Sequence, residues 1–402
     1  MSIFDRIFGR NKQGREIAPS SVRAAYELIQ PWQVGKPQYP AANFTNNVNF
    51  AYRRNELVFA CISLKADSAA QATLRVYDRE TGNELPDHPL RKLIEMPSQR
   101  LRLTEFDFHA ANFAYQDLAG TSAWEIVRDR GRNPVELLSL RPDWLSPIPS
   151  ATNFLAGYEY RMPGNSDVRS LAPDDVLMFR VFDPANQYRG MAPVSVAARA
   201  VDVDNDATDH IKNTLERGGV PAGLISSKQT LDLDSAGRIR RLWRERYGGY
   251  LNWAEPAVLD SDATFQKIGF SFQELGFDVL DARDEARICM VLRVPPILVG
   301  AMVGLEHGTY SNYEQARTAF WHETLIPQYK RVRDVMQVGL ANQFGVDLEW
   351  DFTQVLALQE DIAAKRAFAL DALARGGMTL NDFRSAVGLD KLPSGVGDVL
   401  YV

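Results

Sequence analysis

Long apolar runs are nearly absent from this chain of 402 residues. One run, residues 288–305, is long enough to cross a membrane, but it contains Arg293 and the pair Pro295-Pro296. Two prolines break the helix that a bilayer requires, and a charge at that depth is costly. We therefore expect no membrane segment. Residues 1–20 also lack the apolar core of a secretory signal peptide.

A surplus of basic residues is absent as well. The chain has 45 lysines and arginines against 51 aspartates and glutamates, which gives a net charge of -6. A protein that holds many phosphates needs a basic patch, so tight nucleic-acid binding is not expected. The only two cysteines, Cys61 and Cys289, lie in apolar sequence. We expect both to be buried thiols in a reducing compartment.

Motifs of the common enzyme classes are missing too. There is no GxxxxGK[ST] phosphate loop, and the glycine-rich GAMVGLEHG at residues 300–308 lacks the lysine and a preceding strand. HETLI begins like a zinc-binding HExxH motif, but Ile326 replaces the second histidine. No G-x-S-x-G motif occurs, and the five histidines have no partners at catalytic spacing. We expect no catalytic residues, no metal and no cofactor.

An acidic cluster, DVDNDATD at residues 202–209, is the strongest candidate for a metal site. Three aspartates at alternate positions start like a calcium-binding loop, but alanine occupies the glycine position and Asn213 the position of the closing glutamate. The flanking sequence is typical of one continuous helix, on which Asp202, Asp206 and Asp209 share a face. We interpret the cluster as an acidic stripe along a long helix.

Residues 46–192 alternate between helix and strand signals. NELVFACISLKADSAAQA has apolar residues at helical spacing, and TLRVYD alternates like a strand. SAWEIVRD and PVELLSL predict a hairpin, and YEYRM and DDVLMFRV predict further strands. Thr104 and Asp107 predict a capping box at the start of a helix. We expect an α+β domain with one sheet and flanking helices.

Two long helices are predicted next, at residues 193–217 and 271–293, the second opened by a capping box of Ser271 and Glu274. The intervening residues 218–270 predict a small α/β module. Its strands are AGLIS, PAVLD and TFQKIGF, and its helix follows the first strand.

An apolar loop is predicted at residues 294–313. A capping box of Ser311 and Glu314 is then expected to open another helix, which Pro327 should kink or interrupt. DLEWDF predicts a strand that returns to the first domain. The last part, residues 359–402, predicts two short helices and an extended tail, with a capping box at Thr379 and Asp382. The tryptophans expected to anchor the core or interfaces are Trp243, Trp253, Trp321 and Trp350.

This order of parts resembles that of the portal proteins of tailed bacteriophages, in the shorter-chain branch found in long-tailed phages and gene transfer agents. The resemblance extends from about Asn46 to about Asp398. It is carried by motifs in matching order, among them VFACISLKADSAA, TEFDFHAANFAYQDLAGTSAWEIVRD, GMAPVSVAARA, LERGGVPAGLIS, ICMVLRVPPILVG, TYSNYEQARTAFWHETLIPQYKRV, LEWDF and GGMTLNDFRSAVGL. GTSAWEIV departs from the GNAY that is often found at that point.

The resemblance implies a division of the chain into named parts. After a disordered N-terminal arm come the wing, the first stem helix, the clip, the second stem helix and the tunnel loop. A long kinked helix with its return strand follows, and then a crown with a C-terminal tail. The respective residues are 1–45, 46–192, 193–217, 218–270, 271–293, 294–313, 314–358 and 359–402.

The resemblance also implies a function. Such proteins form a dodecameric ring at one capsid vertex of the virion, and they assemble in the bacterial host cytoplasm. Double-stranded DNA passes non-specifically through the ring during packaging and ejection. The implied partners are other copies of the chain, the terminase large subunit, the major capsid or scaffolding protein and the head–tail adaptor. No ATPase activity of its own is implied, which agrees with the missing phosphate loop.

The implied narrowest part of the channel is the tunnel loop, which contributes Val299, Gly300, Met302, Val303, Gly304, Leu305, Glu306 and His307. Its small and apolar residues would offer DNA few phosphate-binding charges. The stem would line the channel with Asp202, Asp206 and Asp209. Alternatively, this acidic stripe faces solvent or pairs with arginines of a neighbouring subunit.

Two other readings of the sequence are open. One is a hydrolase that uses the acids of residues 202–209, with residues 295–308 as a lid. The other is an interaction module of a phage tail, which would lack a channel.

Overall fold

The computed structural model describes residues 43–164, 167–216, 223–227, 237–238, 241, 263–267, 277–305, 309–392, 396–398 and 400. Most of the expected disordered arm lies outside this part of the chain. Its last residues are ordered, because a short helical turn already begins at Phe44. Within the described residues, no helix is long and apolar enough to cross a membrane.

The first helices form at the positions where the sequence provides caps. Asn55 accepts a hydrogen bond from the Val58 amide and so opens α4 (Glu56–Ala69). The capping box predicted at Thr104 and Asp107 is confirmed at the start of α6 (Glu105–Ala119), and Gly120 ends that helix in the left-handed conformation. The neighbouring helical segments are α3 (Phe44–Asn46), η2 (Asn47–Tyr52) and α5 (Pro89–Glu95).

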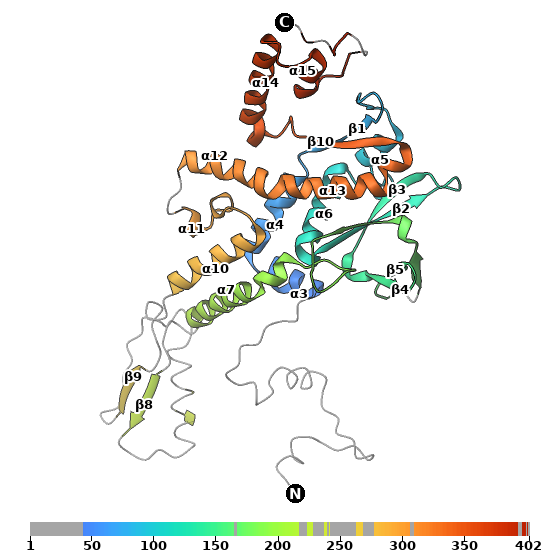
Figure 1. Cartoon of the computed structure of the whole chain (residues 1–402). Coiled ribbons are helices and arrows are strands. Elements are labelled where there is room, and N and C mark those ends of the chain that lie inside the picture. Colours follow the sequence, from blue (N-terminus) through green and yellow to red (C-terminus); the bar gives the residue numbers. More distant parts are fainter. Residues whose placement is uncertain are drawn as a thin grey trace. The chain divides into compact units, whose positions relative to one another are not determined.

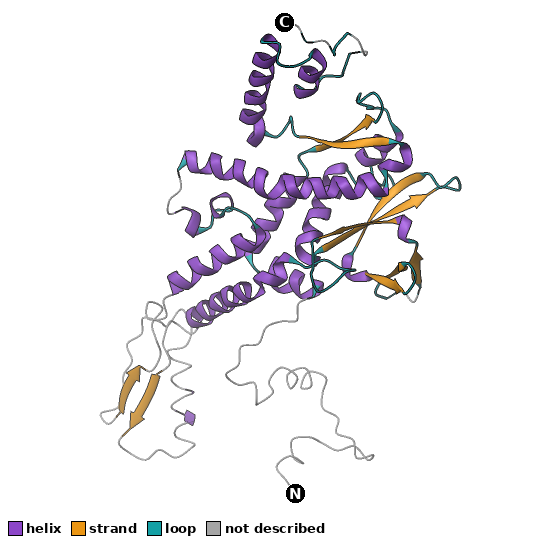
Figure 2. Ribbon diagram, in the orientation of Figure 1, coloured by secondary structure: helices purple, strands orange, loops and turns teal. Residues whose placement is uncertain are grey.

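The strands form several small sheets, and the prediction of one sheet is wrong (Figure 2). β2 pairs antiparallel with both β3 and β7, and β5 pairs antiparallel with both β4 and β6. Proline explains part of this separation, because Pro147 and Pro149 in β4 cannot donate to a second neighbour. The strands are β1 (Thr73–Asp78), β2 (Thr121–Arg128), β3 (Pro134–Leu140), β4 (Leu145–Ser150), β5 (Phe154–Arg161), β6 (Val168–Leu171) and β7 (Val176–Arg180). Short 3-10 turns, η3 (Pro142–Trp144) and η4 (Pro173–Asp175), precede β4 and β7.

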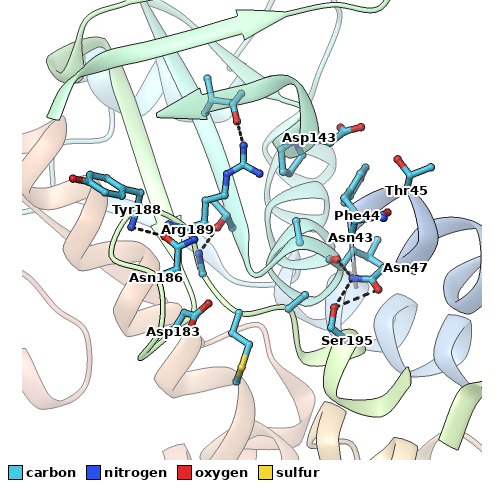
Figure 3. A pocket seen from close by; sticks show the side chains of 18 of the residues that line it. Asn43, Phe44, Thr45, Asn47, Asp143, Asp183, Asn186, Tyr188, Arg189 and Ser195 are labelled. Atoms are coloured by element: carbon cyan, nitrogen blue, oxygen red, sulfur yellow. Dashed lines mark hydrogen bonds between the residues drawn. The ribbon is translucent and has the colours of Figure 1, made fainter. Parts of the chain in front are cut away.

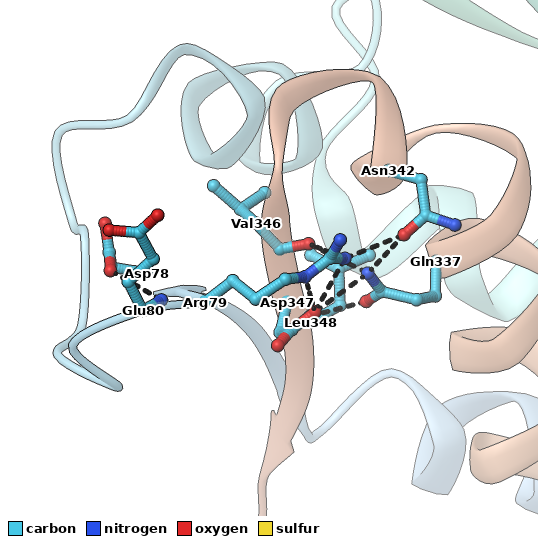
Figure 4. Close-up of polar contacts among 8 residues, drawn as sticks. All are labelled: Asp78, Arg79, Glu80, Gln337, Asn342, Val346, Asp347 and Leu348. Carbon is cyan, nitrogen blue, oxygen red and sulfur yellow. Dashed lines mark hydrogen bonds and ion pairs between the residues drawn. The ribbon is translucent and has the colours of Figure 1, made fainter.

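A late strand, β10 (Val346–Asp351), pairs antiparallel with β1, as the return of DLEWDF to the first domain requires. Side chains reinforce the pairing (Figure 4). The Arg79 guanidinium donates to Asp347 and Asn342, and the Gln337 amide donates to the Val346 carbonyl at 2.8 Å. These contacts hold β10, which comes late in the sequence, against β1 of the first domain.

Two long helices leave this α/β part and lie side by side: α7 (Pro193–Glu216) and α10 (Phe277–Leu292) (Figure 1). Pro193 occupies the first position of α7, where a missing N–H does no harm. Between the two helices, β8 (Gly223–Ser227) pairs antiparallel with β9 (Ala263–Lys267). Three predicted features lie outside the described residues: the strand PAVLD, nearly all of the helix before it, and the capping box of Ser271 and Glu274.

The helix after the apolar loop begins earlier than predicted. Thr309, in extended conformation, accepts a hydrogen bond from the Asn312 amide, so Thr309 rather than Ser311 is the N-cap of α12 (Tyr310–Ala319). The interruption predicted at Pro327 is confirmed. A π-helical segment, η6 (Phe320–Leu325), precedes this proline and leads into α13 (Ile326–Gly339), because proline cannot donate a helical hydrogen bond.

The chain ends in two helices, as predicted: α14 (Gln359–Ala374) and α15 (Leu380–Ala386). The capping box of Thr379 and Asp382 is confirmed, with both of its hydrogen bonds present. Two 3-10 turns, η7 (Ala341–Phe344) and η8 (Leu356–Leu358), flank β10.

Aromatic side chains dominate the main core. Tyr329 of α13 is fully buried against Trp321, Trp350 and Phe113. Trp321 and Trp350 are therefore core residues as predicted, while Trp243 and Trp253 lie outside the described residues. Cys61 and Cys289 are buried thiols, also as predicted, with their sulfur atoms 4.0 Å apart.

One ion pair is buried inside this core. Lys65 of α4 donates to Asp117 of α6 at 2.7 Å, and each side chain is only 3% exposed. Such a pair adds little net stability, but loss of one partner leaves a buried charge without compensation. Burial raises the pKa of Asp117, and the charge of Lys65 opposes that shift.

A buried histidine makes the stability of the fold depend on pH. Burial, with a smaller effect from the charge of Arg91, lowers the pKa of His109 to about 3. An unfolded histidine binds a proton near pH 6.5, so the unfolded state takes up protons first as the pH falls. Stability from this source is complete above pH 6.5 and is lost progressively down to pH 3.

We expect this loss to reach about 2 kcal/mol of unfolding free energy by pH 5. The substitution His109→Gln should remove that part of the pH dependence, because glutamine does not titrate. Urea unfolding at pH 7 and pH 5 measures it, with substitution of the exposed His322 by Gln as the control for the exchange of histidine for glutamine. An equal loss in wild type and His109→Gln would contradict this role for His109.

Candidate functional site

The apolar loop between α10 and α12 is the first candidate site. α10 ends at Leu292, and Arg293 takes a left-handed conformation with φ of 57°. The Val294 amide then donates to the Cys289 carbonyl at 3.0 Å, which satisfies one of the last helical carbonyls. The prolines break the helix as predicted, and a 3-10 turn, η5 (Pro296–Leu298), follows.

The loop folds into a short turn, α11 (Met302–Leu305), with an inner and an outer side. Met302 is 61% exposed and Leu305 is 51% exposed. Val299 and Val303 are instead partly buried and pack against the main core. Of the apolar side chains predicted to form the constriction, Met302 and Leu305 are thus the two that project outward. Glu306 and His307 lie outside the described residues.

Two glycines of the loop have different structural roles. Gly300 has φ of 72°, a conformation that glycine adopts without strain. Gly304 packs so closely on η5 that a Cβ atom would lie 2.3 Å from the Ile297 nitrogen. Gly304 therefore permits close packing of the loop on η5.

One carboxylate ties the loop to α10. The Val303 amide donates to the Glu285 carboxylate at 3.0 Å. A charged acceptor makes this hydrogen bond stronger than an ordinary one. The sequence carries no signal for this contact, because 18 residues separate the partners and neither belongs to a recognised motif.

The acidic stripe of α7 is the second candidate site. Asp206 and Asp209 are exposed, and Asp202 is half-buried. The Arg54 guanidinium forms an ion pair with Asp209, a partner that sequence reasoning missed. Burial raises the pKa of Asp202, and the negative charge of Asp206 adds to that shift.

A calcium loop is contradicted by the conformation of this segment. Residues 202–209 lie inside the continuous helix α7, where alternate residues point to different sides. Asp204 accordingly accepts a hydrogen bond from the Asn55 amide at 2.6 Å, away from Asp202 and Asp206. Within the described residues, no group of three or more metal-binding side chains comes together.

A polar cleft of about 610 Å³ is the third candidate (Figure 3). Several of the polar side chains that line it form hydrogen bonds within the chain. The Asn47 amide donates to the Leu118 carbonyl at 2.7 Å and to the Ser195 hydroxyl at 2.9 Å. The Asn186 side chain accepts from the Tyr188 and Arg189 amides. Ser195 is hydrogen-bonded to Asn47, and within the described part of the chain no hydrogen bond joins it to a basic side chain. These contacts fix the start of α7 to the α/β part.

Solved structures establish the class of protein. A chain from the neck of an empty gene transfer agent (GTA) particle is 25% identical, with a TM-score of 0.65 over 89% of this chain and 96% of that one. A chain from the neck of a native GTA particle, computed with C12 symmetry, is 24% identical, with a TM-score of 0.62 over the same shares. The crystal structure of an HK97-family phage portal protein from Corynebacterium diphtheriae is 13% identical, with a TM-score of 0.55 over 78% and 96%. The fold is therefore that of an HK97-family portal protein.

The family model of the phage portal protein matches residues 56–388, and this chain belongs to that family. Two curated relatives, uncharacterized proteins of Rickettsia bellii and Rickettsia felis, are each 26% identical over 86% of this chain and 89% of their own length. Portal proteins are structural and non-catalytic, so the hydrolase reading is wrong. The acids of α7 and the apolar loop are therefore not interpreted as a catalytic site and its lid.

The contact between Glu285 and the loop gives a direct test of how the loop is held. We expect Glu285→Ala to increase hydrogen–deuterium exchange at the Val303 amide by about tenfold, because a hydrogen bond to a charged acceptor contributes about 1.5 kcal/mol. Glu285→Gln keeps an acceptor oxygen and is the matched control. Unchanged exchange in Glu285→Ala would mean that packing alone holds the loop.

Proposed function

We propose that this chain forms a closed ring in the neck of a phage or GTA particle, through which double-stranded DNA passes during packaging and ejection. The observation that carries the proposal is the match to chains from GTA necks over 96% of their length. One of those necks has C12 symmetry, which supports a dodecamer. Head-to-tail contacts between identical copies close such a ring.

This proposal assigns each segment of the chain to one part of a portal ring. The α/β part, with its return strand β10, is the wing, and α7 and α10 are the two stem helices. The strands β8 and β9 belong to the clip, and α14 and α15 to the crown. The clip would meet the terminase large subunit and later the head–tail adaptor, while the capsid or scaffolding protein would surround the ring. Assembly would take place in the host cytoplasm, and the finished ring would stay at a capsid vertex of the virion.

The apolar loop fits the narrowest part of a channel. Its outward side chains, Met302 and Leu305, cannot form ion pairs with phosphate, so DNA could slide past them. The loop leaves α10 at the left-handed Arg293, just before the two prolines, and the hydrogen bond from the Val303 amide to Glu285 ties it back to that helix. The flanking Val299, Gly300, Val303 and Gly304 would shape this segment, and Glu306 and His307 would complete it.

The acidic stripe suits the ring in either of two orientations. Carboxylates of Asp202, Asp206 and Asp209 that face the channel would repel DNA phosphates and favour sliding. Carboxylates that face a neighbouring copy would hold the ring together through arginines. Arg54 already pairs with Asp209, and the charge pattern of α10 favours the second orientation for Asp202 and Asp206.

The double substitution Met302→Lys with Leu305→Lys tests the role of the loop. Lysines at a constriction would bind phosphates and resist movement, so we expect DNase-protected DNA per particle to fall by roughly tenfold. Ring assembly should be unchanged, because both side chains are exposed. Val303 is unsuitable for this test, since it packs inward.

The matched control places two lysines on exposed apolar positions of the α/β part, Phe154→Lys with Val168→Lys. This control should package DNA normally. Normal packaging by the loop variant would remove Met302 and Leu305 from the constriction.

A further inference from the structure

Two helical surfaces with opposite charge are exposed on the same chain. The acidic flank of α7 consists of Asp202, Asp206 and the 39%-exposed Val203. The basic face of α10 consists of Arg283 and Arg287, whose side chains are 55% and 51% exposed, together with Val279 and Met290. Val279 is 74% exposed and Met290 is 69% exposed, which places two large apolar side chains in solvent on the same face of one helix.

The inward faces of both helices are occupied by the core. α7 buries Val194, Ala197 and Val201, and α10 buries Ile288 and Leu292. These residues recur at intervals of three or four, so the opposite side of each helix faces outward. Neither the acidic flank nor the basic face belongs to the hydrophobic core of the single chain.

The two surfaces point away from each other within one chain. Asp204 lies on the side of α7 that faces α10: its pKa is raised by burial and then by Asp281 and by Glu56 and Asp284. Asp202 and Asp206 are each two residues from Asp204 and so point to the other side of α7. One copy therefore presents acids on one flank of the helix pair and arginines on the other.

The charged groups are incompletely satisfied by their own chain. Asp202 Oδ2 is buried and, among the residues that the structure describes, has no hydrogen-bond donor. Arg283 and Arg287 each approach Asp284 only at 4.0 Å, which leaves most of their N–H groups available. A buried acceptor without a donor on one surface and arginine donors on the other are chemically complementary.

We propose that the basic face of α10 in one copy packs on the acidic flank of α7 in the next copy. This proposal rests on the ring proposed above and identifies the contact that closes it. Asp202 and Asp206 are one helical turn apart, as are Arg283 and Arg287, so both pairs repeat at about 6 Å. Two ion pairs can therefore form in register, while Val279 and Met290 cover Val203.

The arrangement is heterologous, as a ring requires. Each copy uses two different surfaces, so every copy binds one neighbour through α7 and another through α10. An apolar hollow of about 610 Å³ lies beside Met290 and is lined by Pro295 and Phe320. It offers room for side chains of the neighbouring α7, close to the root of the apolar loop.

Two charge-reversed variants test the contact. The first carries Asp202→Arg and Asp206→Arg and has two basic surfaces. The second carries Arg283→Asp and Arg287→Asp and has two acidic surfaces. Mass photometry should find that ring formation by either variant alone falls at least tenfold relative to wild type. An equimolar mixture should restore rings, because each basic α7 can then meet an acidic α10, and every restored ring should contain an even number of copies.

The matched control reverses two exposed acids elsewhere, Asp87→Arg with Asp174→Arg, and should form rings like wild type. Circular dichroism melts establish that each variant is folded. Normal rings from either variant alone, or no rings from the mixture of folded variants, would overturn the proposed contact. If the first variant forms normal rings but fails to package DNA, the acids face the channel instead.

The same experiment separates this contact from the ring proposal itself. A wild-type protein that stays monomeric at every concentration would count against the ring. Association of the two variants with each other but not with themselves would still support the contact between α7 and α10.

Discussion

The contact between Tyr329 and the end of α4 is the constraint on which the rest of the structure depends. The Tyr329 hydroxyl donates to the Ala69 carbonyl at 2.7 Å, and its own carbonyl accepts from the Trp350 indole at 2.9 Å. One residue thus joins α4, α13 and β10, the first with its hydroxyl and the last with its backbone carbonyl. Because the aromatic cluster around Tyr329 is buried, it fixes the positions of the helices that pack on it. Among these contacts, Cys289 of α10 lies against Cys61 of α4.

The fixed positions of the long helices suit the ring proposed above. α7 joins the core at its first turn through Val194, and α10 joins it at its last turns through Ile288 and Leu292, so these turns cannot shift without opening the core. The loop beyond Arg293 is anchored in the same core by Val294 and Ala301, while its outer side chains, Met302 and Leu305, meet solvent. The proposed constriction therefore consists of exposed apolar side chains on a loop that the core holds in place.

Local signals in the sequence predicted much of the fold and less of the site. The capping boxes at Thr104 and Thr379 were predictable because their partners are three residues apart, and Pro327 marked the interruption of a helix. The separate sheets and the contact of Glu285 with Val303 were not, because strand pairing and side-chain contacts between distant residues leave no periodic pattern. Apolar character alone also could not separate outward Met302 from inward Val303.

The central claim is that this chain assembles into a ring with a channel. Negative-stain electron microscopy of the purified protein, with mass photometry on the same sample, tests it most directly. The account predicts closed rings with a central hole and a mass of about twelve copies, in line with the C12 symmetry of the similar GTA neck. A compact dimer without a hole would contradict it, because two copies cannot enclose a channel through head-to-tail contacts of this kind.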